Sequence, residues 1–259
     1  MAGVDAHTEP ETEREAIALN PALDRAGLAA AFARAGRLHI PDLLVAEHAQ
    51  RLHRCLAGFD AWNLVLSGQD KHYDVFPEQR AAMTPAQYEE LQRSVYAGAR
   101  WGFRYMYDDY PIWDHHRAGT GRLPLLDRLH DFLNGRDFLD FARAITGLDD
   151  IAFADSQATR YGPGHLLTRH TDDVPGKARR AAYVLNLTPR WQPDWGGYLL
   201  FFDQAGHVET GFMPSFNALN IFAVPQDHAV GCVAPFAGGY RYAITGWLRA
   251  GDPPPPDAD

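Results

Sequence analysis

The stretch RAAYVLNLTPRWQPDWGGYLLFFD, residues 180–203, shows the pattern that governs the second half of the chain. Its two apolar runs, 180–187 and 197–203, flank a segment with two prolines, one Asp and one Gly. Short apolar runs between turn residues predict β-strands. The pattern recurs and predicts strands at 151–161, 165–170, 180–187, 197–203, 206–212, 217–224, 227–234 and 239–249. About eight strands in so short a segment favour a double-sheet barrel of jelly-roll type.

Before residue 148 the apolar side chains follow a helical spacing instead. Thr84 and Pro85 supply an N-cap and a first helical position, and glycines at 36, 135 and 147 separate or end helices. The predicted helices are centred on the apolar sets 23–32, 48–59, 85–96, 125–133 and 138–145. We therefore expect an α+β fold, a double-stranded β-helix (jelly-roll) barrel whose N-terminal helices buttress one sheet.

Composition limits the class of protein and the number of domains. A chain of 259 residues with 46% hydrophobic residues suits one large domain with a packed core. We expect a flexible leader at 1–20, a single domain at 21–250 and a disordered tail at 251–259. Within that domain, 21–147 is mainly helical support and 148–250 is the barrel that holds the site.

Charge and the absence of targeting patterns exclude several partners. A formal net charge of −9 argues against a general nucleic-acid binder. No run approaches the roughly 18 apolar residues of a membrane helix, and the first 20 residues lack the apolar core of a signal peptide. The two cysteines, Cys55 and Cys232, form no CxxC pair. We expect a cytoplasmic protein with neither a nucleic-acid nor a membrane partner, whose oligomeric state stays open.

A histidine followed two residues later by an acid can present both side chains on one face of a strand. About 1.5 such pairs are expected by chance from this composition. Four occur, and they begin at His7, His72, His170 and His207. Spacing alone therefore cannot select a site.

The context of each pair favours His170-Thr171-Asp172. This pair ends a predicted strand, and a later strand carries His228, followed 13 residues on by Arg241. Two histidines and one carboxylate are the facial triad of non-haem iron oxygenases, which leaves three coordination positions open. An arginine nearby can hold a distal carboxylate through its fork of N–H donors. We predict His170, Asp172 and His228 as metal ligands.

The motifs around these residues resemble a known family. The segment YGPGHLLTRHTD, residues 161–172, is similar to the iron-binding segment of prolyl-hydroxylase-like iron(II)/2-oxoglutarate-dependent dioxygenases. So are YVLN at 183–186, WGG at 195–197, His228 and RYAITGW at 241–247. The resemblance covers roughly residues 155–249 and looks closest to the bacterial proline hydroxylase-like group. Residues before 148 carry little that matches.

The resemblance implies a reaction and a set of roles. His170, Asp172 and His228 hold Fe(II), and 2-oxoglutarate chelates the metal while its far carboxylate pairs with Arg241. Tyr161 adds a hydrogen bond. Tyr183 is a further candidate for co-substrate binding, with packing in the core as the alternative, since an aromatic on a central strand is usually core. O2 takes the remaining position, and ascorbate is a supporting reductant. The enzyme then hydroxylates a prolyl residue in a protein or peptide and releases succinate and CO2.

Other interpretations remain open at this stage. The same chemistry on a free amino acid or a biosynthetic small molecule fits the motifs equally well. A cupin-like metal-binding or sensing domain would need no Arg241, and a zinc hydrolase would need a general base that the motifs do not supply. Two segments are candidates for substrate contacts: the aromatic run 100–113 and the polar loop 171–180. Each is equally explained as ordinary structure, a buried element and a solvated connection respectively.

Overall fold

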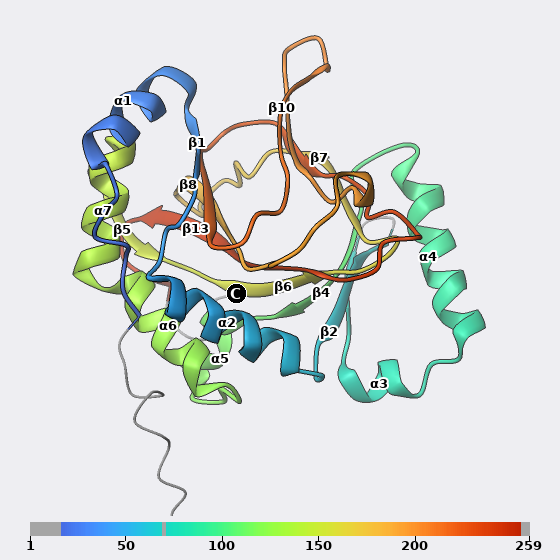
Figure 1. Cartoon of the computed structure of the whole chain (residues 1–259). Coiled ribbons are helices and arrows are strands. Elements are labelled where there is room, and N and C mark those ends of the chain that lie inside the picture. Colours follow the sequence, from blue (N-terminus) through green and yellow to red (C-terminus); the bar gives the residue numbers. More distant parts are fainter. Residues whose placement is uncertain (1–16, 69–70, 255–259) are drawn as a thin grey trace, which may run out of the picture.

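The computed structural model describes residues 17–68 and 71–254, and its strands form a nearly closed antiparallel barrel (Figure 1). The second half supplies nine of these strands, close to the predicted apolar runs. The predicted strand at 151–161 forms two strands, because residues 155–156 leave the extended pairing and interrupt it. The nine are β5 (Ile151–Ala154), β6 (Gln157–Tyr161), β7 (Leu166–His170), β8 (Arg179–Asn186), β9 (Leu199–Phe202), β10 (Val208–Phe212), β11 (Ala218–Ala223), β12 (His228–Val230) and β13 (Arg241–Ala250).

The first half contains the five predicted helices and adds elements that the apolar spacing did not indicate. The predicted helices are α1 (Arg25–Ala35), α2 (Ala46–Gly58), α4 (Pro85–Ala99), α6 (Pro124–Asn134) and α7 (Arg136–Thr146). Thr84 caps α4 as expected, since its hydroxyl accepts from the Gln87 N–H. The additional elements are β1 (Arg37–Ile40), β2 (Asn63–Ser67), β3 (His72–Val75), α3 (Pro77–Ala81), β4 (Tyr105–Tyr110) and α5 (Ile112–Ala118).

The four early strands extend the barrel sheet rather than form a separate layer. The hydrogen-bonded order is β1-β11-β8-β13-β6-β4-β7-β12-β9-β10, with β2 beside β4, β3 beside β2 and β5 beside β13. Strand β4 thus lies between β6 and β7, two strands that follow each other in the sequence. The expectation that helices precede all strands is wrong on this point.

A buried charge cluster holds β4 in that position. The Asp108 side chain is fully buried, and its carboxylate pairs with Arg160 of β6 (2.7 Å between Nη2 and Oδ2) and with Arg80 of α3. Two arginines offset the cost of burying the carboxylate. The cluster therefore ties α3 and β4 to the strand that leads into the candidate site.

Side chains bridge the two free edges of the path of strands. Arg37 on β1 contacts Glu209 of β10 (2.6 Å between Nη2 and Oε2) and the Thr210 hydroxyl (3.1 Å). His39 stacks on Phe212, with 5.3 Å between ring centroids. These contacts bring the first and last strands of the order together, so the barrel is nearly closed by side chains where no backbone ladder joins them.

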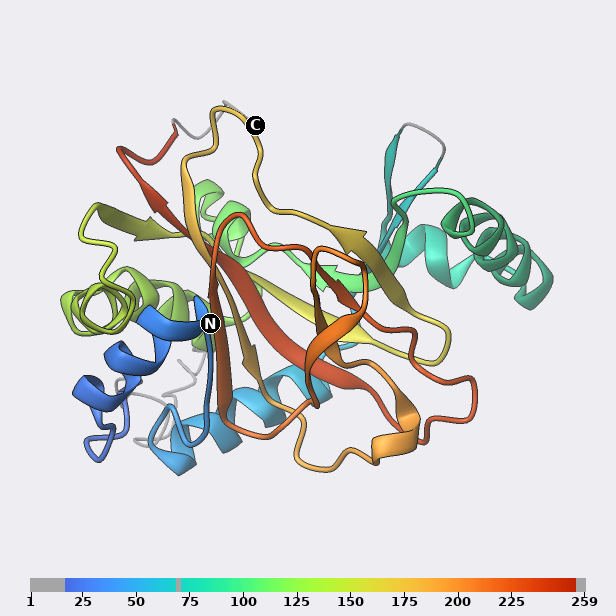
Figure 2. The same cartoon turned by 90° about the horizontal axis from the view of Figure 1, so that it is seen from above.

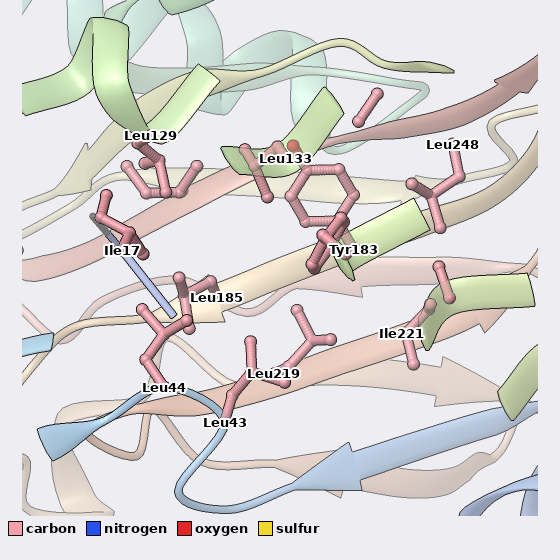
Figure 3. Packing of buried hydrophobic residues seen from close by; sticks show 14 of the residues in the cluster. Ile17, Leu43, Leu44, Leu129, Leu133, Tyr183, Leu185, Leu219, Ile221 and Leu248 are labelled. Atoms are coloured by element: carbon pink, nitrogen blue, oxygen red, sulfur yellow. The ribbon is translucent and has the colours of Figure 1, made fainter. Parts of the chain in front are cut away.

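Helices cover one sheet, as predicted. Along β8, alternate side chains point to opposite faces, because the side-chain period of a strand is two. Tyr183 and Leu185 join the core beneath α1, α2, α6 and α7, whereas Ala182 and Val184 face the barrel interior with Phe222. Figure 3 shows the helix-side core, in which Leu129 and Leu133 of α6 approach Tyr183 and Leu185.

The two helical groups lie on opposite sides of the barrel. Figure 2 shows α1, α6 and α7 on one side and α3 and α4 on the other, with the strands between them. No helix within residues 17–68 and 71–254 is long and apolar enough to cross a membrane.

The predicted leader and tail need one correction. Residues 17–20 are packed rather than part of a flexible leader: Ile17 is buried in the core, and Leu19 forms a bridge with Leu44. Residues 1–16 lie outside the described part of the chain, as does the end of the predicted tail, 255–259. The Pro254 carbonyl accepts a hydrogen bond from Arg117 of α5.

Candidate metal centre and co-substrate pocket

The three predicted metal ligands lie together. Strand β7 ends at His170, and β12 pairs with it so that His228 faces His170 across the ladder. The chain continues two residues beyond β7 to Asp172, whose Oδ1 lies 3.6 Å from His170 Nε2 and whose Oδ2 lies 3.4 Å from His228 Nε2. One ligand atom from each residue falls within 4.8 Å of the other two. The antiparallel pairing of β7 with β12 produces this convergence.

Backbone carbonyls orient both imidazoles. His170 Nδ1 lies 2.9 Å from the Thr168 carbonyl oxygen, and His228 Nδ1 lies 2.9 Å from the Gln226 carbonyl oxygen. A carbonyl only accepts, so each Nδ1 carries the hydrogen and each Nε2 keeps its lone pair. Such outer hydrogen bonds fix the tautomer that a metal-binding histidine needs. Both lone pairs are on the nitrogens nearest the Asp172 carboxylate.

Electrostatics favour the protonation states that a metal requires. Burial by itself raises the pKa of Asp172, but the proximity of the His170 and His228 imidazoles outweighs it and holds the pKa below its ordinary value. Burial lowers the pKa of His228, which keeps that imidazole neutral. Two imidazoles and one carboxylate fit a divalent first-row metal such as Fe(II).

A pocket of about 460 Å³ opens beside these three residues. Its inner part is lined by apolar side chains from the barrel interior, which exclude water. Its outer part is aromatic and polar. The inner set comprises Ala182, Val184, Leu199, Phe222 and Val230, and the outer set includes Phe103, Tyr105, Thr171, Val174, Arg179 and Trp247.

Arg241 supplies a buried positive charge to the same pocket. It is the first residue of β13, is 1% exposed, and lies opposite Tyr161 in the β6–β13 ladder. Its Nε has no hydrogen-bond partner, and no carboxylate within residues 17–68 and 71–254 pairs with it. An uncompensated buried charge is costly, so the pocket is suited to a ligand that brings a carboxylate. The unpaired guanidinium of Arg241 therefore fits a dicarboxylate such as 2-oxoglutarate.

The two predicted tyrosines differ in their surroundings. Tyr161 lines the pocket, stacks on Tyr107 with 5.0 Å between centroids, and lies 5.1 Å from the Arg241 guanidinium carbon. Its hydrogen bond to the co-substrate stays a prediction. Tyr183 also borders the pocket, but its side chain packs into the helix-side core and its hydroxyl already donates to the Asp155 carbonyl (2.8 Å). Its role as a co-substrate contact stays a prediction, and its hydroxyl would have to leave that carbonyl.

Other residues of this region also have defined contacts. His165 lies away from the pocket, bonded to the Gly162 N–H and the Tyr88 hydroxyl (3.1 Å each). Gly196 and Gly197 have φ of 67° and 68°, which explains the need for glycine after Trp195.

Sequence reasoning missed three pocket residues or left them without a role. Tyr105 and Tyr107 belong to the aromatic run at 100–113, which the sequence indicated only by composition. Arg179 lies in the predicted polar loop. Its guanidinium donates to the Asp172 carbonyl (3.2 Å between Nη1 and O) and stacks 3.5 Å from the centre of the Trp247 ring. Only the pairing of remote strands reveals these neighbours.

Comparison with known proteins agrees with this geometry. Residues 156–249 match the model of the 2OG-Fe(II) oxygenase superfamily. A curated relative, prolyl 3-hydroxylase OGFOD1 of Mus musculus, is 30% identical over 119 residues, which are 43% of this chain but only 21% of that protein. The match therefore spans about a fifth of the length of the relative.

Two solved structures share the fold at low sequence identity. A Pseudomonas putida prolyl-4-hydroxylase has a TM-score of 0.55 and 19% identity, covering 88% of this chain and 100% of its own. A prolyl hydroxylase from Trichoplax adhaerens, in complex with a peptide fragment of the oxygen degradation domain of hypoxia inducible factor, has a TM-score of 0.51 and 17% identity. That match covers 87% of this chain and 89% of its own. These likenesses establish the jelly-roll fold of the oxygenases.

Proposed function

We propose, from the premise that residues 156–249 belong to the 2OG-Fe(II) oxygenase superfamily, that this protein is an iron(II)- and 2-oxoglutarate-dependent dioxygenase. It hydroxylates a prolyl residue in a protein or peptide and releases succinate and CO2. The observation that carries the proposal is the buried, unpaired Arg241 in the same pocket as His170, Asp172 and His228. A barrel that only bound a metal would have no use for this charge.

Each side chain of the pocket has a part in the reaction. His170, Asp172 and His228 would hold Fe(II) on one side and leave the opposite side for small ligands. When bound, iron(II) with 2-oxoglutarate and O2 supplies the oxidation of a substrate C–H bond, coupled to decarboxylation of the co-substrate. Arg241 binds the far carboxylate of the co-substrate through its fork of donors, and Tyr161 offers a hydroxyl beside it.

The apolar interior contributes by excluding water. Val184, Leu199 and Phe222 surround the inner pocket, so the charge pair between Arg241 and a bound carboxylate forms away from solvent. An ion pair in such an environment is stronger than one in water. The carbonyls of Thr168 and Gln226 meanwhile keep the imidazoles from rotating. The chain thus binds and orients the reactants on a rigid sheet.

The choice of a prolyl substrate is supported by the relatives. The curated relative is named a prolyl 3-hydroxylase, and both structural neighbours described above are named prolyl hydroxylases. The outer pocket between Phe103, Val174 and Trp247 is wide and aromatic, a composition common in surfaces that contact other proteins. We infer that a polypeptide segment enters there.

Succinate release tests this function directly. The purified protein, anaerobically loaded with Fe(II) and 2-oxoglutarate and then exposed to air, is assayed against a panel of prolyl peptides and free amino acids. We expect succinate and a hydroxylated product with at least one prolyl peptide. Turnover only with free amino acids would replace the substrate class. Tight zinc binding without any response to 2-oxoglutarate would overturn the oxygenase function itself.

A further inference from the structure

We propose that Tyr105 positions the substrate by presenting a hydrogen-bond acceptor to a backbone N–H of the polypeptide. A pair of side chains from the neighbouring hairpin, His72 and Asp74, sets the orientation of its hydroxyl. This inference rests on the proposed function. It uses the His72-x-Asp74 motif, which the metal centre leaves unexplained.

The three side chains form one hydrogen-bonded chain. The Tyr105 hydroxyl lies 2.7 Å from His72 Nδ1, and His72 Nε2 lies 2.8 Å from Asp74 Oδ1. Both histidine nitrogens are therefore occupied, each at a distance typical of a well-formed hydrogen bond. The backbone supports the arrangement, since the Tyr105 N–H donates to the Ser67 hydroxyl (3.0 Å) and Ser67 pairs with His72 in the β2–β3 ladder.

The chain of bonds fixes which partner donates. The Asp74 carboxylate only accepts, so a neutral His72 carries its hydrogen on Nε2 and its lone pair on Nδ1. The Tyr105 hydroxyl must then donate to Nδ1. A phenolic hydroxyl has one hydrogen and further acceptor capacity, and within residues 17–68 and 71–254 no other bond to this oxygen is present. The atom therefore offers an acceptor and no free donor.

Tyr105 occupies a suitable place to use this acceptor. Its ring lines the outer pocket and belongs to a row of aromatic side chains that runs inward from Phe103 through Tyr107 to Tyr161. Phe103 lies 5.0 Å from the His170 ring, between centroids, so this end of the row is beside the metal ligands. Tyr105 therefore lies on the wall of the pocket that also contains the metal ligands.

A polypeptide offers the matching donor in a particular position. A prolyl residue inside a chain has no N–H of its own, so the nearest backbone donors belong to its neighbours. An acceptor at the mouth of the pocket can bind one of these and set the register of the chain over the metal. A single hydrogen bond at a protein surface changes affinity severalfold, which suits a contact that selects register rather than supplies most of the binding.

The first test compares enzyme variants with the prolyl peptide that has the lowest KM in the succinate screen. Tyr105→Phe should raise the peptide KM by about five- to tenfold, the loss of one hydrogen bond, without changing the KM for 2-oxoglutarate. Asp74→Asn should raise the peptide KM by about two- to threefold, because the hydroxyl remains but its orientation is less fixed. Tyr73→Phe is the matched control: Tyr73 is on the same hairpin, exposed and outside the pocket, and its variant should match wild type.

The second test changes the peptide substrate instead of the protein, so the fold of the enzyme is not affected. Each backbone N–H near the proline is replaced in turn by an ester oxygen, with the side chains kept. One ester should raise the KM of the wild-type enzyme by about five- to tenfold. That same ester should have no further effect on Tyr105→Phe, because the two changes remove the same bond.

The outcomes separate this inference from the function on which it depends. Succinate release with a prolyl peptide, together with an equal ester effect in wild type and Tyr105→Phe, would overturn the role of Tyr105 and leave the oxygenase intact. So would an unchanged peptide KM in Tyr105→Phe. Absence of succinate with every prolyl peptide would overturn both proposals. If Asp74→Asn lowers the melting temperature but leaves the peptide KM unchanged, the hydrogen-bonded chain of Tyr105, His72 and Asp74 only stabilises the hairpin, and the proposal is wrong.

Discussion

Two histidine–acid pairs of identical spacing have different chemistry: one lines the pocket, and the other reaches it only through Tyr105. His170 and Asp172 follow β7, with side chains 16% and 7% exposed, whereas His72 and Asp74 lie on β3, with side chains 52% and 41% exposed. In the β3 pair the imidazole is bonded directly to its carboxylate (2.8 Å). In the β7 pair the corresponding atoms are 3.6 Å apart, and the other imidazole nitrogen faces a backbone carbonyl instead of a hydroxyl.

The difference shows that the surroundings, and not the spacing, decide what such a pair can bind. A carbonyl on Nδ1 leaves Nε2 of His170 available, and β12 brings a second imidazole to the same carboxylate. His72 has both nitrogens occupied and no third ligand from another strand within the described residues. The first pair can therefore hold a cation, and the second can orient a hydroxyl.

The largest expected difference between the two pairs appears when the imidazole of each is removed in turn. His170→Ala should abolish the visible charge-transfer band of the anaerobic iron(II)–2-oxoglutarate complex, along with succinate release, because two ligands cannot hold the metal. His72→Ala should keep the band at wild-type intensity. Absorption spectra of the two variants at equal protein concentration provide the measurement. Loss of the band in His72→Ala would break the distinction between the pairs.

The next effect separates the co-substrate from the metal within the β7 site. Arg241→Ala should weaken 2-oxoglutarate binding by about 10- to 100-fold, since a charge-assisted hydrogen bond is worth about 1.5–3 kcal/mol. Titration of the charge-transfer band with 2-oxoglutarate measures this affinity. Iron binding should be unchanged, because Arg241 contacts no ligand to the metal. An equal loss of both affinities would make Arg241 a structural residue.

The gain in the free energy of unfolding on binding iron(II) also distinguishes the two histidine–acid pairs, and measuring it requires no catalytic turnover. Iron(II) at 100 times its dissociation constant should stabilise the wild-type protein by about 2.7 kcal/mol under anaerobic conditions. His72→Ala should gain the same amount, and His228→Ala should gain none. Thermal unfolding with and without the metal gives these values. A metal-induced gain that survives in His228→Ala would place the ion elsewhere.

The smallest expected effect is the contribution of the exposed pair to stability. Asp74→Asn should lower the free energy of unfolding by less than about 1 kcal/mol, because exposed ion pairs contribute little. Denaturant unfolding of Asp74→Asn beside wild type measures the difference. A much larger loss would mean that the β3 pair holds the hairpin in place, contrary to its exposure.

The sequence predicted the barrel strands because each is a short apolar run between turn residues. It could not predict β4, whose Asp108 and Asp109 interrupt the apolar alternation. Asp108 is accommodated there by pairing with the remote residues Arg80 and Arg160. The order of His170, Asp172, His228 and Arg241 indicated the site, since these residues lie on strands that the apolar pattern identifies. The carbonyls that fix the imidazoles, and the contact between Tyr105 and His72, depend on backbone pairing that no spacing encodes.

Strand β13 carries Arg241 at its inner end and Trp247 six residues later, beside the mouth. Because this strand pairs with β5, β6 and β8, its register is fixed along its whole length. Six residues of extended chain measure roughly 20 Å, so the depth of the guanidinium below the entrance is set by covalent geometry. The depth of Arg241 should therefore stay constant even when the loops at the entrance of the proposed dioxygenase diverge. Selection for a new hydroxylation target can then act on the loops alone.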